Sequence, residues 1–221
     1  MNKIKACIFD LDGVIVDTAT FHYKAWKRLA NELGFDLTQE QNEQLKGISR
    51  MKSLDILLDI GNMNATDEEK QKLADKKNSW YRSYIKEMKP EDILPGTLEF
   101  FNELKKENIK IGVGSASKNA TTILRQIELE TYLDSIIDGN KVSHAKPDPE
   151  VFVKGAEELK EKPGNCVVFE DAQSGVEAAN NGGMYSVGVG SEKILHEADM
   201  VVAGLHEMDL NKLKELEKLN K

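Results

Sequence analysis

Six short apolar segments that alternate with longer helical segments constrain the fold of this chain most strongly. The expected strands cover residues 4–9, 109–114, 135–137, 166–169, 185–189 and 200–202. Their apolar residues run continuously, which is typical of strands that helices cover on both faces. Helical spacing or helix-start signals mark residues 97–107, 121–127, 151–159, 175–181 and 210–219. The alternation predicts an α/β fold with a Rossmann-like parallel sheet.

One region, residues 16–88, interrupts this alternation, because it has helical periodicity and no strand signal. Within it, residues 66–69 have the form of a capping box that begins a charged helix. About seventy helical residues are far more than a crossover between parallel strands requires. We therefore expect an inserted α-helical cap domain at 16–88 and a discontinuous α/β core made of 1–15 and 89–221. Two linkers between these domains would make a hinge.

The charge balance and the cysteines limit the class of protein. The chain has 30 Lys and Arg against 38 Asp and Glu, a net charge of −8, which argues against binding to nucleic acid or to an anionic membrane. Cys7 and Cys166 each lie in an apolar run, so we expect buried free thiols and a reducing compartment. The first strand begins too early for a signal peptide, and no apolar stretch is long enough to cross a bilayer. These features predict a cytoplasmic protein.

The strongest chemical signal is Asp10 and Asp12, which directly follow the first expected strand and precede Gly13. Residues two apart on an extended chain point the same way, so both carboxylates can face one site. Two acids this close repel each other unless a cation lies between them, and Mg²⁺ prefers oxygen ligands. Gly13 would let the chain turn away sharply. The pattern indicates a cation site at the end of the strand.

Three further polar groups occur at strand ends or before a helix. Ser115, after the second strand, could bind an anion together with helix N-terminal amides, or could be a plain helix N-cap. Lys146 lies in a turn that Pro147 and Pro149 stiffen. An acidic pair, 170–171, follows the fourth strand. Ligands of parallel α/β sheets bind beyond the carboxyl ends of the strands, so we expect these groups to meet in one crevice.

These residues resemble the four motifs of the haloacid dehalogenase superfamily of phosphotransferases. An Asp-x-Asp-Gly motif, a Ser or Thr, a Lys and an acidic pair correspond in order to residues 10–13, Ser115, Lys146 and 170–171. The resemblance covers essentially the full chain. It implies a Mg²⁺-dependent enzyme on a superfamily core with an inserted helical cap.

The resemblance also implies a role for each acidic residue. Asp10 is the implied nucleophile, which becomes an aspartyl phosphate, and Asp12 is the implied general acid and base. The implied metal ligands are Asp10, the backbone carbonyl of Asp12 and Asp171, with support from Glu170. Lys146 and Ser115 would hold the remaining oxygens of the transferred phosphoryl group.

Within the superfamily, the chain is similar to the mutases that interconvert β-glucose 1-phosphate and glucose 6-phosphate. The similarity rests on Asp17, Thr18, His22, Ala25, Trp26, residues 45–50, Lys77, Asn78 and residues 115–119. It implies that β-glucose 1,6-bisphosphate is the intermediate and activator. A second phosphate site is then needed away from the reacting centre, and Arg50 is its natural ligand. The implied substrate-binding and phosphate-binding residues are His22, Trp26, Gly47, Ser49, Arg50, Lys77, Ser115, Ala116, Ser117, Lys118, Asn119 and Lys146.

Other interpretations of the same residues stay open. Without the resemblance, Arg50 is a surface cation, Lys77 belongs to a solvated helix face and Trp26 packs inside the cap. A sugar-phosphate phosphatase would share Asp10 but admit water to the phosphoenzyme. A phosphonate hydrolase would need a cap lysine that forms a Schiff base, and a non-catalytic sugar-phosphate sensor would not need Asp10 and Asp12 together. The expected ligands are small sugar phosphates, and we expect a monomer.

Overall fold

A six-stranded parallel sheet forms the centre of the core in the computed structural model, which describes residues 3–45 and 48–219. The strands are β1 (Ala6–Phe9), β2 (Lys110–Gly114), β3 (Ser135–Ile137), β4 (Cys166–Glu170), β5 (Tyr185–Val189) and β6 (Met200–Val202). Their order is β3-β2-β1-β4-β5-β6, and each neighbouring pair is parallel. All six correspond to predicted strands, with small differences at the ends. The predicted α/β fold with a parallel sheet is confirmed.

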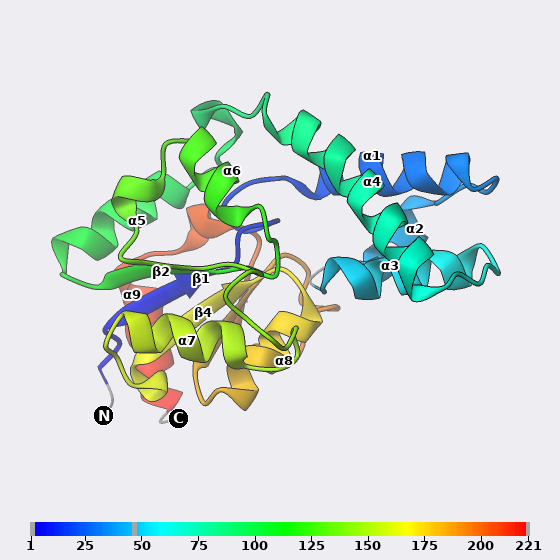
Figure 1. The fold of residues 1–221 in the computed structure, drawn as a ribbon. Coiled ribbons are helices and arrows are strands. Elements are labelled where there is room, and N and C mark those ends of the chain that lie inside the picture. The colour runs from blue at the N-terminus through cyan, green and yellow to red at the C-terminus, as the bar shows by residue number, and fades with distance from the viewer. Residues whose placement is uncertain (1–2, 46–47, 220–221) are drawn as a thin grey trace.

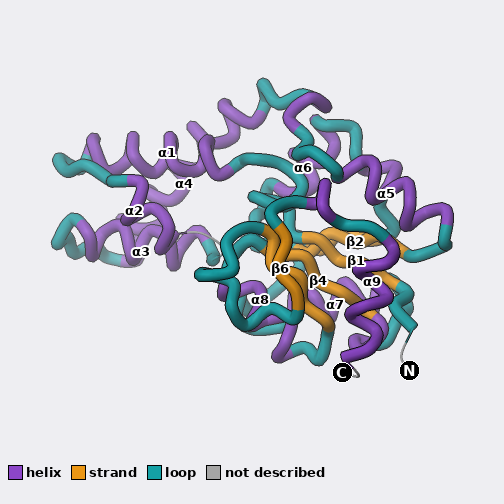
Figure 2. The backbone as a smooth tube through the Cα atoms, turned by 180° about the vertical axis from the view of Figure 1, so that it is seen from behind, coloured by secondary structure: helices purple, strands orange, loops and turns teal. Residues whose placement is uncertain are grey.

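Helices cover both faces of this sheet, as Figures 1 and 2 show. On one face, β1 packs Cys7 and Phe9 in a cluster with α5 (Thr97–Lys106), α6 (Ala120–Gln126) and α9 (Leu210–Leu216). On the other face, Ala6 and Ile8 pack with α7 (Glu150–Glu158) and α8 (Gln173–Asn181). Because alternate residues of a strand point to opposite faces, a strand covered on both sides is apolar at every position.

Short helical turns connect the larger elements, and the last described helix packs on the core. Turns of 3₁₀ helix occur at Glu43–Leu45, Pro90–Asp92, Glu130–Tyr132, Pro163–Asn165, Leu205–Glu207 and Glu217–Leu219. The predicted last helix packs on the core through Leu213 and Leu216, but it loses α-helical geometry after Leu216, and Leu219 is exposed. Cys7 and Cys166 are buried free thiols, as predicted. Within 3–45 and 48–219, no helix has the length and apolar character needed to span a membrane.

The strand order places β1 at the topological switch point of the sheet. Along the chain, β2 and β3 add to one side of β1, and β4, β5 and β6 then add to the other. Phe9 is level with Val113 of β2 and with Phe169 of β4. The residues that follow these three strands therefore share one edge of the sheet, where α/β folds bind their ligands.

Four helices lie in the region of the expected cap, and we call them the cap: α1 (Ala19–Glu32), α2 (Gln39–Asn42), α3 (Arg50–Ile60) and α4 (Asp67–Ile85). They enclose an apolar cluster of their own, and α1 and α4 lie side by side beyond the sheet edge (Figure 1). The predicted capping box is present, because Thr66 and Glu69 exchange hydrogen bonds at the start of α4. The two connections to the core run together, since Leu94 N donates to Ile15 O at 2.8 Å.

Candidate active site

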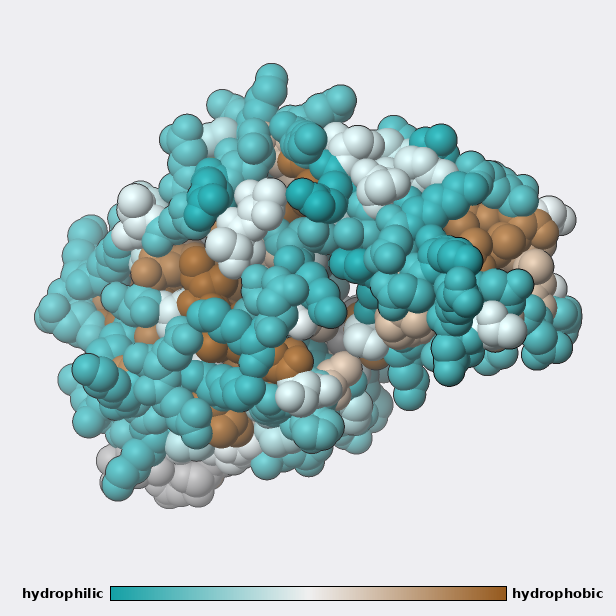
Figure 3. Space-filling model, viewed as in Figure 1, coloured by the Kyte–Doolittle hydropathy of each residue, from teal (hydrophilic) through white to brown (hydrophobic). Residues whose placement is uncertain are grey.

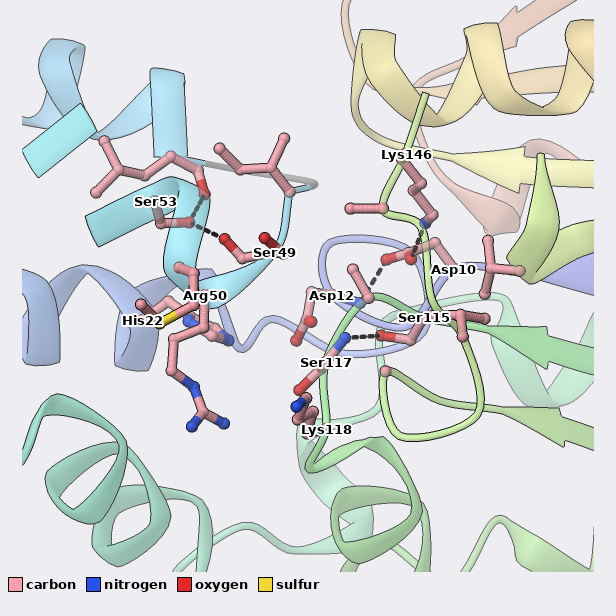
Figure 4. A pocket seen from close by; sticks show the side chains of 18 of the residues that line it. Asp10, Asp12, His22, Ser49, Arg50, Ser53, Ser115, Ser117, Lys118 and Lys146 are labelled. Carbon is pink, nitrogen blue, oxygen red and sulfur yellow. Dashed lines mark hydrogen bonds and ion pairs between the residues drawn. The ribbon is translucent and has the colours of Figure 1, made fainter. Parts of the chain in front are cut away.

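Asp10 is held rigidly at the end of β1. Its backbone N–H donates to Phe169 O at 2.9 Å, which continues the pairing of β1 with β4. Its side chain is nearly buried: Oδ1 accepts a hydrogen bond from Lys146 Nζ at 2.5 Å, and Oδ2 accepts one from the Asp12 N–H at 2.9 Å (Figure 4). A carboxylate fixed by two donors cannot rotate freely, so its orientation is set before any ligand binds.

Lys146 lies between two carboxylates in the loop that precedes α7. Its buried ammonium contacts Asp10 Oδ1 and Glu170 Oε1. Burial alone would lower the pKa of this lysine, but the charges of Asp10 and Glu170 outweigh that effect and hold the pKa above its ordinary value. Lys146 is therefore a permanent cation beside Asp10.

Glu170, the last residue of β4, is also buried, and its Oε2 accepts a hydrogen bond from the Ala172 N–H at 3.0 Å. Burial raises the pKa of Glu170 to about 7 against the opposing charge of Lys146, and the carboxylate of Asp10 adds to the rise. Gly175 at the start of α8 makes room for this side chain, because a Cβ there would collide with the Glu170 carboxylate. The second acidic pair is thus packed into the sheet edge.

Asp12 and Gly13 form the turn that carries the chain away from β1. Gly13 has a φ of +86°, and a Cβ at this position would collide with the carboxylate of Asp171. Asp12 Oδ1 is buried without a hydrogen-bond partner among the described residues. Burial and then the neighbouring charge of Asp10 raise the pKa of Asp12 to about 7. A carboxyl group with such a pKa can both give and take a proton near neutral pH.

The oxygen atoms at this edge fit a hard divalent cation. Asp171 packs against the turn that contains Asp12 and Gly13, and Asp10 lies at the start of that turn. Burial is the main cause of the raised pKa values of Asp12 and Glu170, and the negative charge of Asp10 adds to both rises, while Lys146 opposes them. Carboxylate and carbonyl oxygens are the ligands that Mg²⁺ prefers.

Ser115 belongs to a turn and not to a helix N-terminus. Its backbone N–H donates to Ile137 O at 2.9 Å, and its Oγ accepts a hydrogen bond from the Ser117 N–H at 3.1 Å. Helix α6 begins at Ala120, so the expectation that helix-terminal amides flank Ser115 is wrong, and Ser115 is not an N-cap. Turn residues 116–118 border the same cavity as Ser115.

A cavity of about 1070 Å³ separates the core from the cap. Figure 3 shows the hollow between two mostly hydrophilic lobes, and Figure 4 shows cap side chains facing core side chains across it. Of the predicted site residues, it is lined by Asp10, Asp12, His22, Trp26, Ser49, Arg50, Lys77, Ser115, Ala116, Ser117, Lys118, Asn119, Lys146 and Asp171. Glu170 lies behind this lining and contacts it through Lys146. Gly47 falls outside the described residues.

Lys77 is buried in the cap, with 2% of its surface exposed. Its Nζ lies 2.9 Å from His22 Nδ1 and 4.3 Å from the centre of the Trp26 ring. Burial and then the positive charge of Arg50 lower the pKa of Lys77 well below its ordinary value. The interpretation of Lys77 as part of a solvated helix face is wrong, because α4 turns this residue inward against α1. Trp26 is itself buried in the cap, as its apolar character predicts, and also reaches the cavity.

Arg50 is the first residue of α3, and its side chain extends into the cavity toward α4, on the cap side (Figure 4). Ser49 caps this helix, since its Oγ accepts a hydrogen bond from the Lys52 N–H at 3.3 Å. The guanidinium lies 3.9 Å from Asp75 Oδ1 of α4, and 23% of the side chain is exposed. The interpretation of Arg50 as an ordinary surface cation does not fit this inward position.

Several residues that line the cavity were not among the predicted site residues, and two of them, Ser53 and Asn78, make side-chain hydrogen bonds there. Ser53 donates its hydroxyl to Leu45 O at 3.1 Å and to Ser49 O at 3.2 Å, which ties the start of α3 to the preceding turn. Asn78 of α4 accepts a hydrogen bond from Asn119 of the core at 3.0 Å. Each had a weak signal: Ser53 lies one turn after a helix cap, and Asn78 directly follows Lys77.

The free energy of unfolding is expected to decrease below about pH 6.5, and His22→Gln is expected to reduce that decrease. Burial and then the charges of Lys77 and Arg50 lower the pKa of His22 well below its ordinary 6.5. The unfolded chain therefore binds a proton that the folded protein does not, so the contribution of His22 is present above pH 6.5 and is lost as the pH falls. Urea unfolding between about pH 5 and 8 measures this. The His196→Gln variant, at an exposed position, is the control. If the free energy of unfolding depended on pH identically in both variants, the decrease could not be assigned to His22.

The fold and the site together define a class of protein. The family model of haloacid dehalogenase-like hydrolases matches residues 7–189, and the chain belongs to this family. It is 42% identical over 214 residues to β-phosphoglucomutase of Bacillus subtilis, covering 96% of this chain and 95% of the relative.

Two further comparisons bear on the activity. The crystal structure of a β-phosphoglucomutase from Clostridium difficile is similar, with a TM-score of 0.93, 44% identity and 98% coverage of both chains. A Thermotoga maritima protein named phosphorylated carbohydrates phosphatase is 32% identical, covering 96% of this chain and 100% of the relative.

Proposed function

We propose that this chain interconverts β-glucose 1-phosphate and glucose 6-phosphate through phospho-Asp10 and β-glucose 1,6-bisphosphate. One observation carries the proposal: a single cavity has Asp10 and Asp12 on its core side and Arg50 on its cap side. A mutase needs a reacting centre and a separate site for the phosphate that does not react. The two similar β-phosphoglucomutases, at 42% and 44% identity, support the same activity.

In the chemical step, a carboxylate oxygen of Asp10 forms a bond to phosphorus while the bond from phosphorus to a sugar oxygen breaks. Asp12 gives its proton to that leaving oxygen. When the phosphoryl group returns to a sugar, Asp12 takes the proton of the attacking hydroxyl, and Asp10 is released. A pKa near 7 suits both directions, because neither protonation state of Asp12 is rare at neutral pH.

The oxygens of the transferred group need several positive or donor groups. Lys146 supplies a permanent charge next to Asp10, and the Ser115 hydroxyl lies in the adjoining turn. Asp10, the carbonyl of Asp12 and Asp171 are the proposed Mg²⁺ ligands, with Glu170 supporting them. A cation held by these residues would neutralise negative charge on the transferring phosphoryl group.

The second phosphate is assigned to the other end of the cavity. Arg50 would bind it from the cap with two parallel hydrogen bonds, and Ser117, Lys118 and Asn119 would bind it from the core. Lys77, His22 and Trp26 line the space between, where the sugar ring would lie. After the first transfer, the bisphosphate reorients so that its two phosphates exchange places between these sites. We also propose that the protein acts as a monomer.

Hydrolysis of sugar phosphates is the alternative that a specific observation favours, since the Thermotoga maritima relative is named a phosphatase. Both activities use Asp10, and they differ in whether water or a sugar hydroxyl attacks the phosphoenzyme. The cap side of the cavity decides this, because a closed cap excludes water.

The deciding assay supplies the protein with Mg²⁺, β-glucose 1-phosphate and a trace of β-glucose 1,6-bisphosphate, and it follows glucose 6-phosphate and free phosphate in parallel. We expect glucose 6-phosphate as the main product, none from the α anomer, and loss of activity with a chelator that Mg²⁺ reverses. Free phosphate as the main product would replace the mutase with a phosphatase. Full activity in the presence of the chelator would show that the reaction does not require Mg²⁺ and would contradict that part of the proposal.

A further inference from the structure

A hydrogen bond joins the cap to the core through Asn78, a residue to which the proposed chemistry gives no role. Asn119 Nδ2, from the core, donates to Asn78 Oδ1 of α4, in the cap, at 3.0 Å. Both residues line the cavity, and 9% of Asn119 is exposed. Because the two partners belong to different halves of the molecule, this bond exists only while the cap stands close to the core.

The side chain of Asn119 does not cap the helix that it precedes. Asn119 is the N-cap residue of α6, and an asparagine there usually accepts a hydrogen bond from its own helix. Here it makes no side-chain cap hydrogen bond. Its backbone N–H donates to Ser117 Oγ at 3.2 Å, which holds the turn in place. The side-chain amide is thus directed to the cap instead of to α6.

The chemistry of the amide limits what this contact can do. A side-chain amide nitrogen has two N–H donors, and Asn78 occupies one of them. The amide group is planar, so fixing one N–H fixes the direction of the other. An oxygen of a phosphate in the cavity is a strong acceptor for such a donor. Asn78 can therefore orient a phosphate ligand of the core without touching the phosphate.

Helix α4 contacts both sides of the proposed second phosphate site. Asp75 and Asn78 are three residues apart and lie on the same face of the helix. Asp75 lies 3.9 Å from Arg50, the proposed phosphate ligand of the cap, and Asn78 contacts Asn119, the proposed ligand of the core. One helix face thus adjoins two groups that come from opposite walls of the cavity.

We propose that Asn78 is a positioning residue, which orients the Asn119 amide for the phosphate that does not react and so couples cap closure to the presence of that phosphate. The inference rests on the proposed function, because it takes the substrate to be a sugar phosphate with a phosphate at that end. It predicts discrimination between substrates that place a phosphate there and phosphoryl donors that have none.

The test compares β-glucose 1-phosphate with acetyl phosphate, a small donor that can phosphorylate Asp10 and has no second anionic end. Asn78→Ala should lower kcat/KM for the sugar phosphate about tenfold, mainly through KM, and change that for acetyl phosphate less than about twofold. Alanine is the best helix former, so α4 should fold normally, and the melting temperature checks this. Asn102→Ala, at an exposed position on α5, is the matched control.

A double variant separates positioning from simple packing. If Asn78 acts through Asn119, the variant that carries both alanines should be no slower with the sugar phosphate than Asn119→Ala alone. Equal losses for the two substrates, or effects of the two substitutions that multiply, would overturn the inference.

Measurements on the wild-type protein distinguish a failure of this inference from a failure of the proposed function. Its products show whether it isomerises or hydrolyses the sugar phosphate, and the ratio of the two kcat/KM values can be measured in either case. If the wild-type protein hydrolyses the sugar phosphate, and Asn78→Ala lowers the ratio of kcat/KM for the sugar phosphate to that for acetyl phosphate, the proposed mutase activity would be wrong. The proposed role of Asn78 would still stand. A wild-type protein with no preference for the sugar phosphate would overturn the role of Asn78.

Discussion

Asp10→Asn is expected to reduce turnover of sugar phosphates by at least about 10⁴-fold. The reason is chemical: an amide oxygen is too weak a nucleophile to form the bond to phosphorus. The fold should survive, because asparagine keeps an oxygen that can accept from Lys146, which Asp10 contacts at 2.5 Å. Initial rates with β-glucose 1-phosphate measure the loss.

A second measurement on Asp10→Asn tests the covalent intermediate itself. Incubation with acetyl phosphate should add one phosphoryl group to the wild-type protein, seen as a mass increase after rapid acid quenching, and none to the variant. Circular dichroism and the melting temperature control for folding. Residual turnover above a hundredth of the wild-type rate, or phosphorylation of the variant, would rule out Asp10 as the nucleophile.

Asp12→Asn is expected to lower turnover of β-glucose 1-phosphate by about 10²–10⁴-fold, the usual contribution of a general acid and base. Asparagine keeps the backbone of the turn, and its side chain cannot transfer a proton. Transfer from acetyl phosphate to Asp10 should be nearly unaffected, because acetate is a good leaving group and does not need the proton. The variant should therefore accumulate phospho-Asp10.

The contrast between the two variants makes the assignment specific. Asp10→Asn should form no phosphoenzyme, and Asp12→Asn should form one that decays more slowly than that of the wild-type protein. Phosphorylation rates with acetyl phosphate and decay after its removal, both followed by mass spectrometry, measure these steps. If Asp12→Asn slowed phosphorylation by acetyl phosphate as much as turnover of the sugar phosphate, Asp12 would be a structural residue and not the acid and base.

The pattern of apolar residues predicted most of the fold because that pattern is local. A strand that is covered on both faces is apolar at consecutive positions, and all six strands were identified on this basis. The absence of such runs in 16–88 predicted helices there, and α1 to α4 occupy that region within the residues described. The parallel order of the strands then implied that Asp10, Ser115 and Glu170 would lie at one edge of the sheet.

The boundaries around the second motif were harder to predict. Ser115 directly follows β2, yet four residues separate it from the start of α6. Serine is common both at helix N-caps and in turns, so its identity did not distinguish the two. The hydrogen bond from the Ser117 N–H to the Ser115 hydroxyl favours the turn. That bond depends on backbone angles that a single sequence does not specify.

What the sequence by itself determined is the class of fold, the helical insertion and the chemical groups that follow each strand, since these depend on periodicity and on residue type. Tertiary structure alone decided that Lys77 is buried beside His22, that Lys146 lies between Asp10 and Glu170, and that Asn78 contacts Asn119. Each of these contacts joins residues far apart in the chain, from 24 positions between Lys146 and Glu170 to 136 positions between Lys146 and Asp10. Their formation depends on how the cap and the sheet edge pack, and the raised pKa of Asp12 depends in turn on that burial.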